Sequence, residues 1–77
     1  MEWKYHTAAT DGNCKLFGVN IFNYKWQNTG KKAEVTDPRY NVIKVFSVWK
    51  VEIDDIEYEF AAGEFSNSVW GFYLPGK

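Results

Sequence analysis

The clearest pattern in this chain is an alternation of apolar and polar residues between positions 42 and 62. From position 43 to 53 every second residue is Ile, Val, Ser, Trp, Val and then Ile, and after Asp54-Asp55 the alternation continues through Ile, Tyr, Phe and Ala at positions 56–62. A period of two that is rich in β-branched and aromatic residues is typical of a half-buried strand. We therefore predict a β-hairpin with strands at 42–53 and 56–62.

The register of this hairpin follows from its turn. If Asp54 and Asp55 are the turn residues, one face carries only apolar or small pairs: Ile53–Ile56, Val51–Tyr58, Trp49–Phe60 and Ser47–Ala62. The other face carries the pairs Lys50–Glu59 and Glu52–Glu57, of which one is attractive and one repulsive. Each charge pair contributes only about 0.2–1 kcal/mol, so the apolar face decides the register.

The rest of the chain predicts further strands and no long helix. We expect strands at residues 3–9, 14–26 and 69–74, with Asp11-Gly12 as a hairpin turn between the first two. Residues 27–41 are polar and contain Gly30 and Pro38, which indicates a loop with at most a short strand near 33–36.

Two of these predicted strands, 14–26 and 69–74, have apolar side chains on both faces. Such strands are covered on both sides or face a partner. We therefore predict one small all-β domain, residues 1–77, built as an antiparallel meander of about five strands. The meander is expected to curl into a small barrel or sandwich, or to pack against a second copy.

Composition limits how such a domain is stabilised. A chain of 77 residues buries only about 60–65% of its unfolded surface, so its core is small. The single cysteine, Cys14, and the single histidine, His6, exclude an internal disulfide and an internal Cys/His zinc site. The chain has four Trp, five Tyr and six Phe, so aromatic packing or association with another subunit must supply the stability.

The net charge of −1 is unevenly distributed. Residues 1–50 contain eight basic and four acidic residues, whereas residues 51–77 contain one basic and six acidic residues. In an antiparallel sheet this asymmetry is most simply explained by charge pairs between neighbouring strands. No apolar run resembles a signal peptide or a membrane span, and with one free thiol we expect a cytoplasmic protein without a membrane partner.

No motif for catalysis or cofactor binding is found. In a hairpin around Asp11-Gly12, His6 would face Phe17 and Cys14 would face Ala9, so the two side chains would lie on opposite faces and could not form a Cys–His dyad. The acidic residues at 54–59 lack the spacing of a calcium loop. We therefore predict that the protein is not an enzyme and has no cofactor or metal.

Three functions remain. The leading hypothesis is a non-enzymatic protein-interaction module that self-associates through strand edges or an aromatic-rich face. The second is a small β-barrel that binds single-stranded nucleic acid, although the net charge disfavours it. The third is a small acidic inhibitor or immunity-type protein that docks on a basic partner surface. The candidate contact residues, for a ligand or a partner, are Tyr24, Lys25, Trp26, Arg39, Tyr40, Lys44, Phe46 and Lys50.

Overall fold

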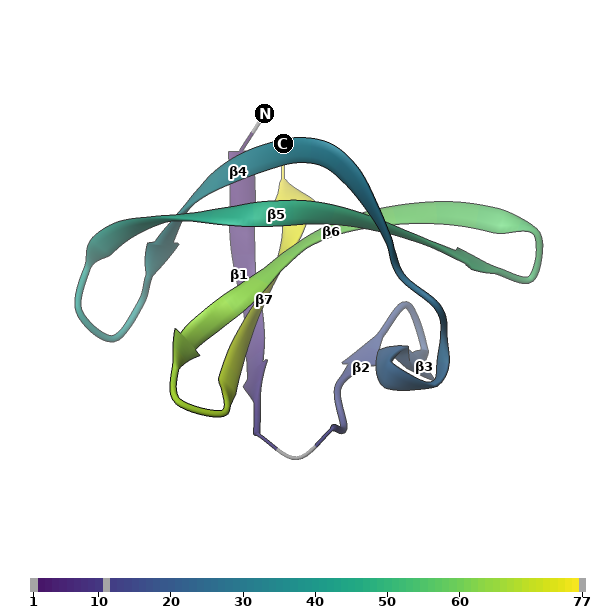
Figure 1. The fold of residues 1–77 in the computed structure, drawn as a ribbon, viewed down its shortest axis with the longest axis horizontal. Coiled ribbons are helices and arrows are strands. Elements are labelled where there is room, and N and C mark those ends of the chain that lie inside the picture. Colours follow the sequence, from purple (N-terminus) through teal and green to yellow (C-terminus); the bar gives the residue numbers. More distant parts are fainter. Residues whose placement is uncertain (1, 11, 77) are drawn as a thin grey trace.

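The structure is a computed structural model that describes residues 2–10 and 12–76. Its main element is a five-stranded antiparallel sheet with the strand order β1-β7-β6-β5-β4, accompanied by a two-stranded hairpin, β2-β3 (Figure 1). The elements are β1 (Glu2–Ala9), β2 (Lys15–Leu16), β3 (Val19–Asn20), the 3-10 helix η1 (Ile21–Asn23), β4 (Gln27–Asp37), β5 (Val42–Ile53), β6 (Ile56–Ser66) and β7 (Val69–Gly76).

The central hairpin, β5–β6, has the predicted register. The pairs from Ile53–Ile56 to Ser47–Ala62 are those expected from the alternation, although β6 continues four residues beyond the predicted end. Asp54 and Asp55 have φ values of 52° and 67°. Positive φ at both turn residues is the geometry of the tight turn that matches the twist of two antiparallel strands.

The predicted hairpin between the first two strands is wrong. β1 pairs with β7, from Glu2–Gly76 to Ala9–Trp70, and the segment that follows β1 does not join this sheet. Asp11 lies outside the described residues. The meander therefore comprises β4 to β7 only, and β1 is added beside the last strand. Local turn chemistry favoured a neighbouring partner, but β7 offers an apolar strand along the whole length of β1.

Residues 14–26 do not form the single long strand that was predicted. Phe17 and Gly18 have φ values of 53° and 82°, which turn the chain back between β2 and β3. The Asn20 side chain then accepts hydrogen bonds from the backbone N–H groups of Cys14 and Phe22, each at 3.2 Å. These bonds fix a compact unit of turns, which we call the cover segment, residues 14–26.

Residues 27–41 are a strand and a short turn where a loop was predicted. β4 pairs with β5 and alternates between buried Ala33, Val35 and Asp37 and exposed residues between them. A bulge between Asn28 and Lys32 contains Gly30, whose φ is 85°. An edge strand with one exposed face has a polar composition, and for this reason residues 27–41 were predicted as a loop.

Two hydrophobic clusters lie on opposite faces of the sheet. The main core, beneath the cover segment, contains Ala9, Cys14, Leu16, Ile21, Val51, Ile53, Phe60, Ala62 and Phe72. The inner core, on the concave side, contains Ala33, Val35, Phe46, Val48, Ala61, Phe65 and Tyr73. The central strands β6 and β7 are therefore packed on both sides, which the two-sided apolar pattern of residues 69–74 predicted for β7 only.

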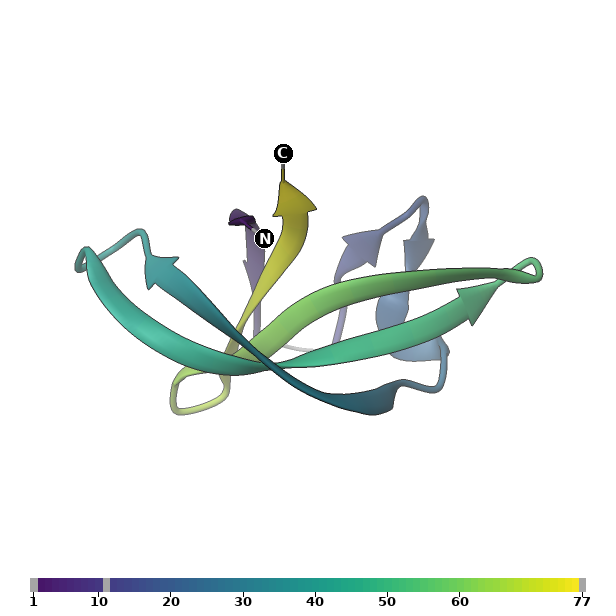
Figure 2. The same ribbon diagram turned by 90° about the horizontal axis from the view of Figure 1, so that it is seen from above.

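The sheet is strongly curved (Figure 2) but is not closed. Its edge strands β1 and β4 contact each other, and Trp3 of β1 packs against the inner core, yet the two strands are not paired. Tyr73 spans the inner core and donates a 2.6 Å hydrogen bond to the Thr36 carbonyl of β4. The prediction of an all-β antiparallel fold with about five strands is confirmed, and a closed barrel is not formed. Among the described residues, no helix is long and apolar enough to cross a membrane.

Candidate functional site

The structure separates the eight candidate contact residues into two regions. Tyr24, Lys25 and Trp26 end the cover segment, and Lys25 and Lys50 line the same small cleft of about 220 Å³. The other four residues lie in the turn between β4 and β5 or early in β5: Arg39, Tyr40, Lys44 and Phe46. They therefore do not form one continuous surface of aromatic and basic side chains.

Two of the candidate aromatic residues are packed inside the molecule. Phe46 is only 6% exposed and contacts Phe65 and Tyr73, with ring centroids 5.7 and 5.9 Å away. The Trp26 ring packs edge-on against Phe60 at 5.0 Å, and its indole N–H donates to the Ile21 carbonyl at 2.9 Å. Neither ring is free to stack on a base, because each contributes to one of the two cores.

The lysines near the β5–β6 hairpin form ion pairs. Lys50 faces Glu59 in the strand register, as predicted, but its ammonium group lies 3.6 Å from Glu57. Glu59 pairs instead with Lys31 of β4, at 3.1 Å. The positive charges of this region are thereby matched by the acidic residues of β6.

Arg39 is held by an internal carboxylate. Asp37 is fully buried, and its two oxygens accept hydrogen bonds from the Arg39 side chain at 3.2 and 3.0 Å. The guanidinium lies 4.7 Å from the centre of the Phe65 ring and 5.0 Å from that of Tyr40. These hydrogen bonds hold the pKa of Asp37 below its ordinary value. The pair fixes the turn that carries Tyr40.

This turn and the start of β5 expose a group of apolar side chains, which we call the hairpin patch. Its members and their exposed fractions are Tyr40 69%, Ile43 69% and Val45 61%, whereas Val42, 46% exposed, lies on the opposite face of β5. Only Tyr40 was among the candidate contacts. Ile43 and Val45 were missed because they continue the alternation of the predicted buried face, and alternation alone does not indicate that they are exposed.

The hairpin patch is exposed because the cover segment ends before it. β5 is regular, so Ile43 and Val45 lie on the same face as Val51 and Ile53 of the main core. The cover segment packs over the other half of this face, where Phe17 stacks on Tyr58 with a centroid distance of 4.3 Å. The β4–β5 turn and the β2–β3 hairpin lie in opposite halves of the molecule along its long axis (Figures 1 and 2).

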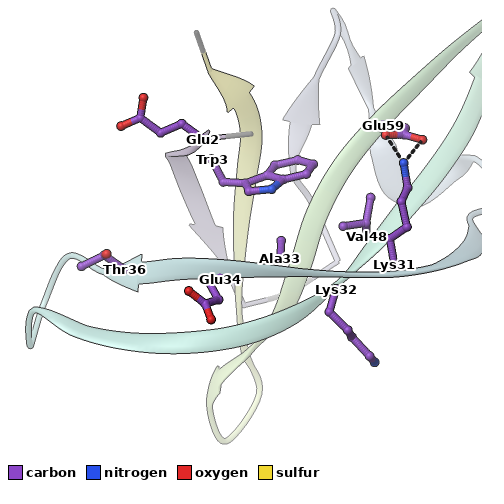
Figure 3. Close-up of a pocket in the computed structure, with 9 residues that line it drawn as sticks. All are labelled: Glu2, Trp3, Lys31, Lys32, Ala33, Glu34, Thr36, Val48 and Glu59. Carbon is purple, nitrogen blue, oxygen red and sulfur yellow. Dashed lines mark hydrogen bonds and ion pairs between the residues drawn. The ribbon is translucent and has the colours of Figure 1, made fainter.

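A second surface feature is a cleft of about 700 Å³ between β1 and β4 (Figure 3). The Trp3 indole projects into it toward Ala33 and Val48, and the Lys31–Glu59 ion pair lies at one side. Across residues 2–10 and 12–76, no three His, Cys, Asp or Glu side chains gather as metal ligands would.

The two residues considered for a catalytic dyad have other partners. His6 Nε2 lies 3.1 Å from the Lys15 carbonyl oxygen. Cys14 is buried in the main core, and burial raises the pKa of its thiol to about 11. A thiol with such a pKa carries little thiolate at neutral pH and is a poor nucleophile.

Comparison with protein-family models, with curated proteins and with solved structures found no match. The function is therefore argued from the surface itself.

Proposed function

We propose that this protein is a non-enzymatic protein-interaction module that self-associates through the hairpin patch. The observation that carries the proposal is the exposure of Ile43 and Val45, at 69% and 61%, on a face that is otherwise a hydrophobic core. Neighbouring apolar side chains on one sheet face are a common feature of protein interfaces. A second copy packed on Ile43 and Val45 would bury the part of this sheet face that the cover segment leaves exposed.

The expected affinity is modest. Full burial of an Ile or Val side chain is worth about 1.5–3 kcal/mol. Because Ile43 and Val45 are 69% and 61% exposed, these four side chains of two copies would contribute on the order of 4–8 kcal/mol. Association also costs several kcal/mol of translational and rotational freedom. After this cost, the remaining gain corresponds to a weak, reversible dimer with a dissociation constant in the millimolar range.

The face is a better candidate for association than the strand edges. β1 is irregular between Tyr5 and Thr7, and β4 is bulged between Asn28 and Lys32. Bulges and lysines on an edge strand are common ways of preventing edge-to-edge pairing. Of the two modes considered from the sequence, we therefore propose packing through a face. This face is the hairpin patch and not the aromatic-rich face that was expected, because Trp26 and Phe46 pack in the two cores.

The alternative functions have less support. A single-strand binder needs exposed rings and free cations, but Trp26 and Phe46 are packed and Arg39 is held by Asp37. An acidic docking surface needs free carboxylates, but Glu57 and Glu59 each pair with a lysine. A reducing, cytoplasmic location is our proposal on the basis of the free thiol of Cys14.

The test is the solution mass measured by light scattering across a concentration series. We expect the wild type to shift from monomer to dimer as the concentration rises, and Ile43→Ser with Val45→Ser to remain monomeric. Ile56→Ser is the matched control, because Ile56 is 54% exposed at the opposite end of β5–β6. A wild type that stays monomeric up to about 5 mM would rule the proposal out, because a dimer with a millimolar dissociation constant is clearly populated at that concentration.

A further inference from the structure

We propose that the cleft between β1 and β4 binds a neutral saccharide, with the Trp3 indole as the surface on which a sugar ring packs (Figure 3). The volume of the cleft is about 700 Å³, which is within the range of about 300–1,000 Å³ that is usual for small-molecule sites. None of the hairpin-patch residues lines this cleft, so the inference does not rest on the proposed self-association.

Trp3 differs from the other tryptophans of the chain. Trp26 packs against Trp49 and Trp70, with ring centroids 5.7 and 6.4 Å away. The indole N–H groups of Trp26 and Trp49 also donate to backbone carbonyls, at 2.9 and 3.2 Å. Within residues 2–10 and 12–76, the Trp3 ring forms no ring pair of this kind, and its N–H has no protein acceptor and is not buried. The indole therefore offers both an apolar face and a free donor to the cleft.

The floor of the cleft is apolar. Ala33 and Val48 line it, and both belong to the inner core against which Trp3 packs. A pyranose ring carries C–H groups on its faces and hydroxyl groups around its edge. Its C–H groups would lie on Trp3 and this floor, and removing such apolar surface from water is favourable by about 25 cal/mol per Å².

The polar side of the cleft is the Lys31–Glu59 ion pair. Lys31 Nζ donates to both carboxylate oxygens of Glu59, at 3.2 and 3.1 Å. An ammonium group has three donors and a carboxylate has about four acceptor sites, so the pair keeps one donor and about two acceptor sites for a ligand. A hydroxyl group both donates and accepts. Neighbouring hydroxyls of one sugar can therefore bind the carboxylate and the ammonium group without separating them.

The charges around the cleft favour a neutral ligand. Its described lining includes three carboxylates and two ammonium groups: Glu2, Glu34, Glu59, Lys31 and Lys32. A phosphate would be repelled by this excess of carboxylates, and the Lys31 ammonium is already paired. A cation would lie beside both ammonium groups. A saccharide avoids each of these costs, which is why we favour it over a nucleotide that would stack on the same indole.

The test is a titration of ¹⁵N-labelled protein, followed by nuclear magnetic resonance, with neutral trisaccharides of β-1,4-glucose, α-1,4-glucose, β-1,4-mannose and β-1,4-N-acetylglucosamine. We expect at least one of them to shift the Trp3 indole N–H signal and the backbone N–H signals of Lys31 and Glu59. The cleft is open and its polar groups are few, so the expected dissociation constant is on the order of 1 mM. The Trp3 indole signal is assigned by its loss in Trp3→Phe.

Variants separate the indole from the ion pair. Trp3→Ala should weaken binding by about tenfold or more, and Trp3→Phe, which keeps apolar packing but lacks the N–H, by about threefold. Glu59→Gln should weaken binding by about threefold or more. Glu57→Gln is the matched control and should bind as the wild type, because Glu57 does not line the cleft and pairs with Lys50.

Three results would overturn the proposal. The first is the absence of any shift with all four trisaccharides at about 10 mM, where a site of millimolar affinity is mostly occupied. The second is a shift that persists unchanged in the Trp3 variants; if Trp3→Ala does not fold, Trp3→Phe and Glu59→Gln decide this point. The third is tighter binding of adenosine or of an oligothymidylate at the Trp3 indole, which would assign the cleft to stacked bases.

Discussion

The two halves of β5 have the same alternating pattern of residues, but apolar side chains of one half are buried and those of the other half are exposed. At its far end, Val51 and Ile53 are 2% and 5% exposed, whereas at its near end Val45 and Ile43 are 61% and 69% exposed. All four lie on one face of one regular strand. The difference is made by residues 14–26, which cover only one half. The alternation of residues thus determines the face of the sheet on which a side chain lies. Whether that side chain is buried depends on the cover segment, which is distant in the sequence.

The largest expected effect is in the covered half. Phe60 is fully buried beneath Trp26 and Phe72, so Phe60→Ala should lower the free energy of unfolding by about 3–5 kcal/mol. Urea denaturation measures this change. Ile43→Ala, the matched variant in the uncovered half, should cost less than about 0.5 kcal/mol in the monomer. Equal losses for the two variants would contradict the contrast between the halves.

A second prediction concerns the reverse face of the uncovered half, which is well packed. Burial, together with the nearby Asp37 carboxylate, raises the pKa of Tyr73 to about 12 from an ordinary value of 10.0. Because the raised pKa favours the protonated, folded form, stability is unaffected below pH 10 and decreases as the pH rises from 10 to 12. Two pKa units correspond to about 2–3 kcal/mol.

Denaturation at a series of alkaline pH values measures this loss, and Tyr73→Phe should remove it from the profile. The variant also loses the hydrogen bond to Thr36, so its stability at pH 7 should be lower by about 1 kcal/mol. A variant with the wild-type alkaline profile would show that another group titrates.

A smaller change should loosen the cover segment itself. Asn20→Ala removes an acceptor for two backbone N–H groups and should cost about 1 kcal/mol. Hydrogen exchange should show faster exchange at residues 14–26 than in β6. Asn28→Ala is a suitable control, because the Asn28 side chain accepts only the Gly30 N–H in an exposed bulge. Uniform acceleration over the whole chain would indicate that the cover segment does not open separately.

The last prediction concerns reactivity and not stability. Because the pKa of Cys14 is raised to about 11, its thiol at pH 8 should react with a disulfide reagent roughly 100-fold more slowly than a free cysteine. Opening the cover segment with Asn20→Ala should increase this rate. Reaction at the rate of an unfolded control would mean that the covered half is as open as the hairpin patch.

The sequence predicts those parts of the fold that are determined locally. The β5–β6 register follows from a two-residue turn and an uninterrupted alternation, and both are correct in the structure. The β1–β7 pairing is not predictable in this way, because its partners are about 70 residues apart and nothing local identifies them. β4 was missed because an exposed edge strand is polar, like a loop.

The candidate site was only partly predictable for the same reason. Arg39, Tyr40 and Lys44 were selected by their residue types and lie in the β4–β5 turn or early in β5, and their role as contacts stays a prediction. Ile43 and Val45 were assigned to the interior, since their burial depends on how far the cover segment reaches. Phe46 was expected at the surface, but it belongs to the inner core, which forms only when the sheet curves.

The pairing of β1 with β7 also determines how the molecule would respond to a pulling force. Glu2 lies opposite Gly76 in this antiparallel pair, so the start of β1 and the end of β7 are neighbours (Figure 1). A force that separates these ends acts along the hydrogen bonds between the strands, and it loads the outermost pair alone before it reaches the next. The strands would therefore separate one rung at a time, at low force. A pull along β5, in contrast, would load its ladders with both β4 and β6 together.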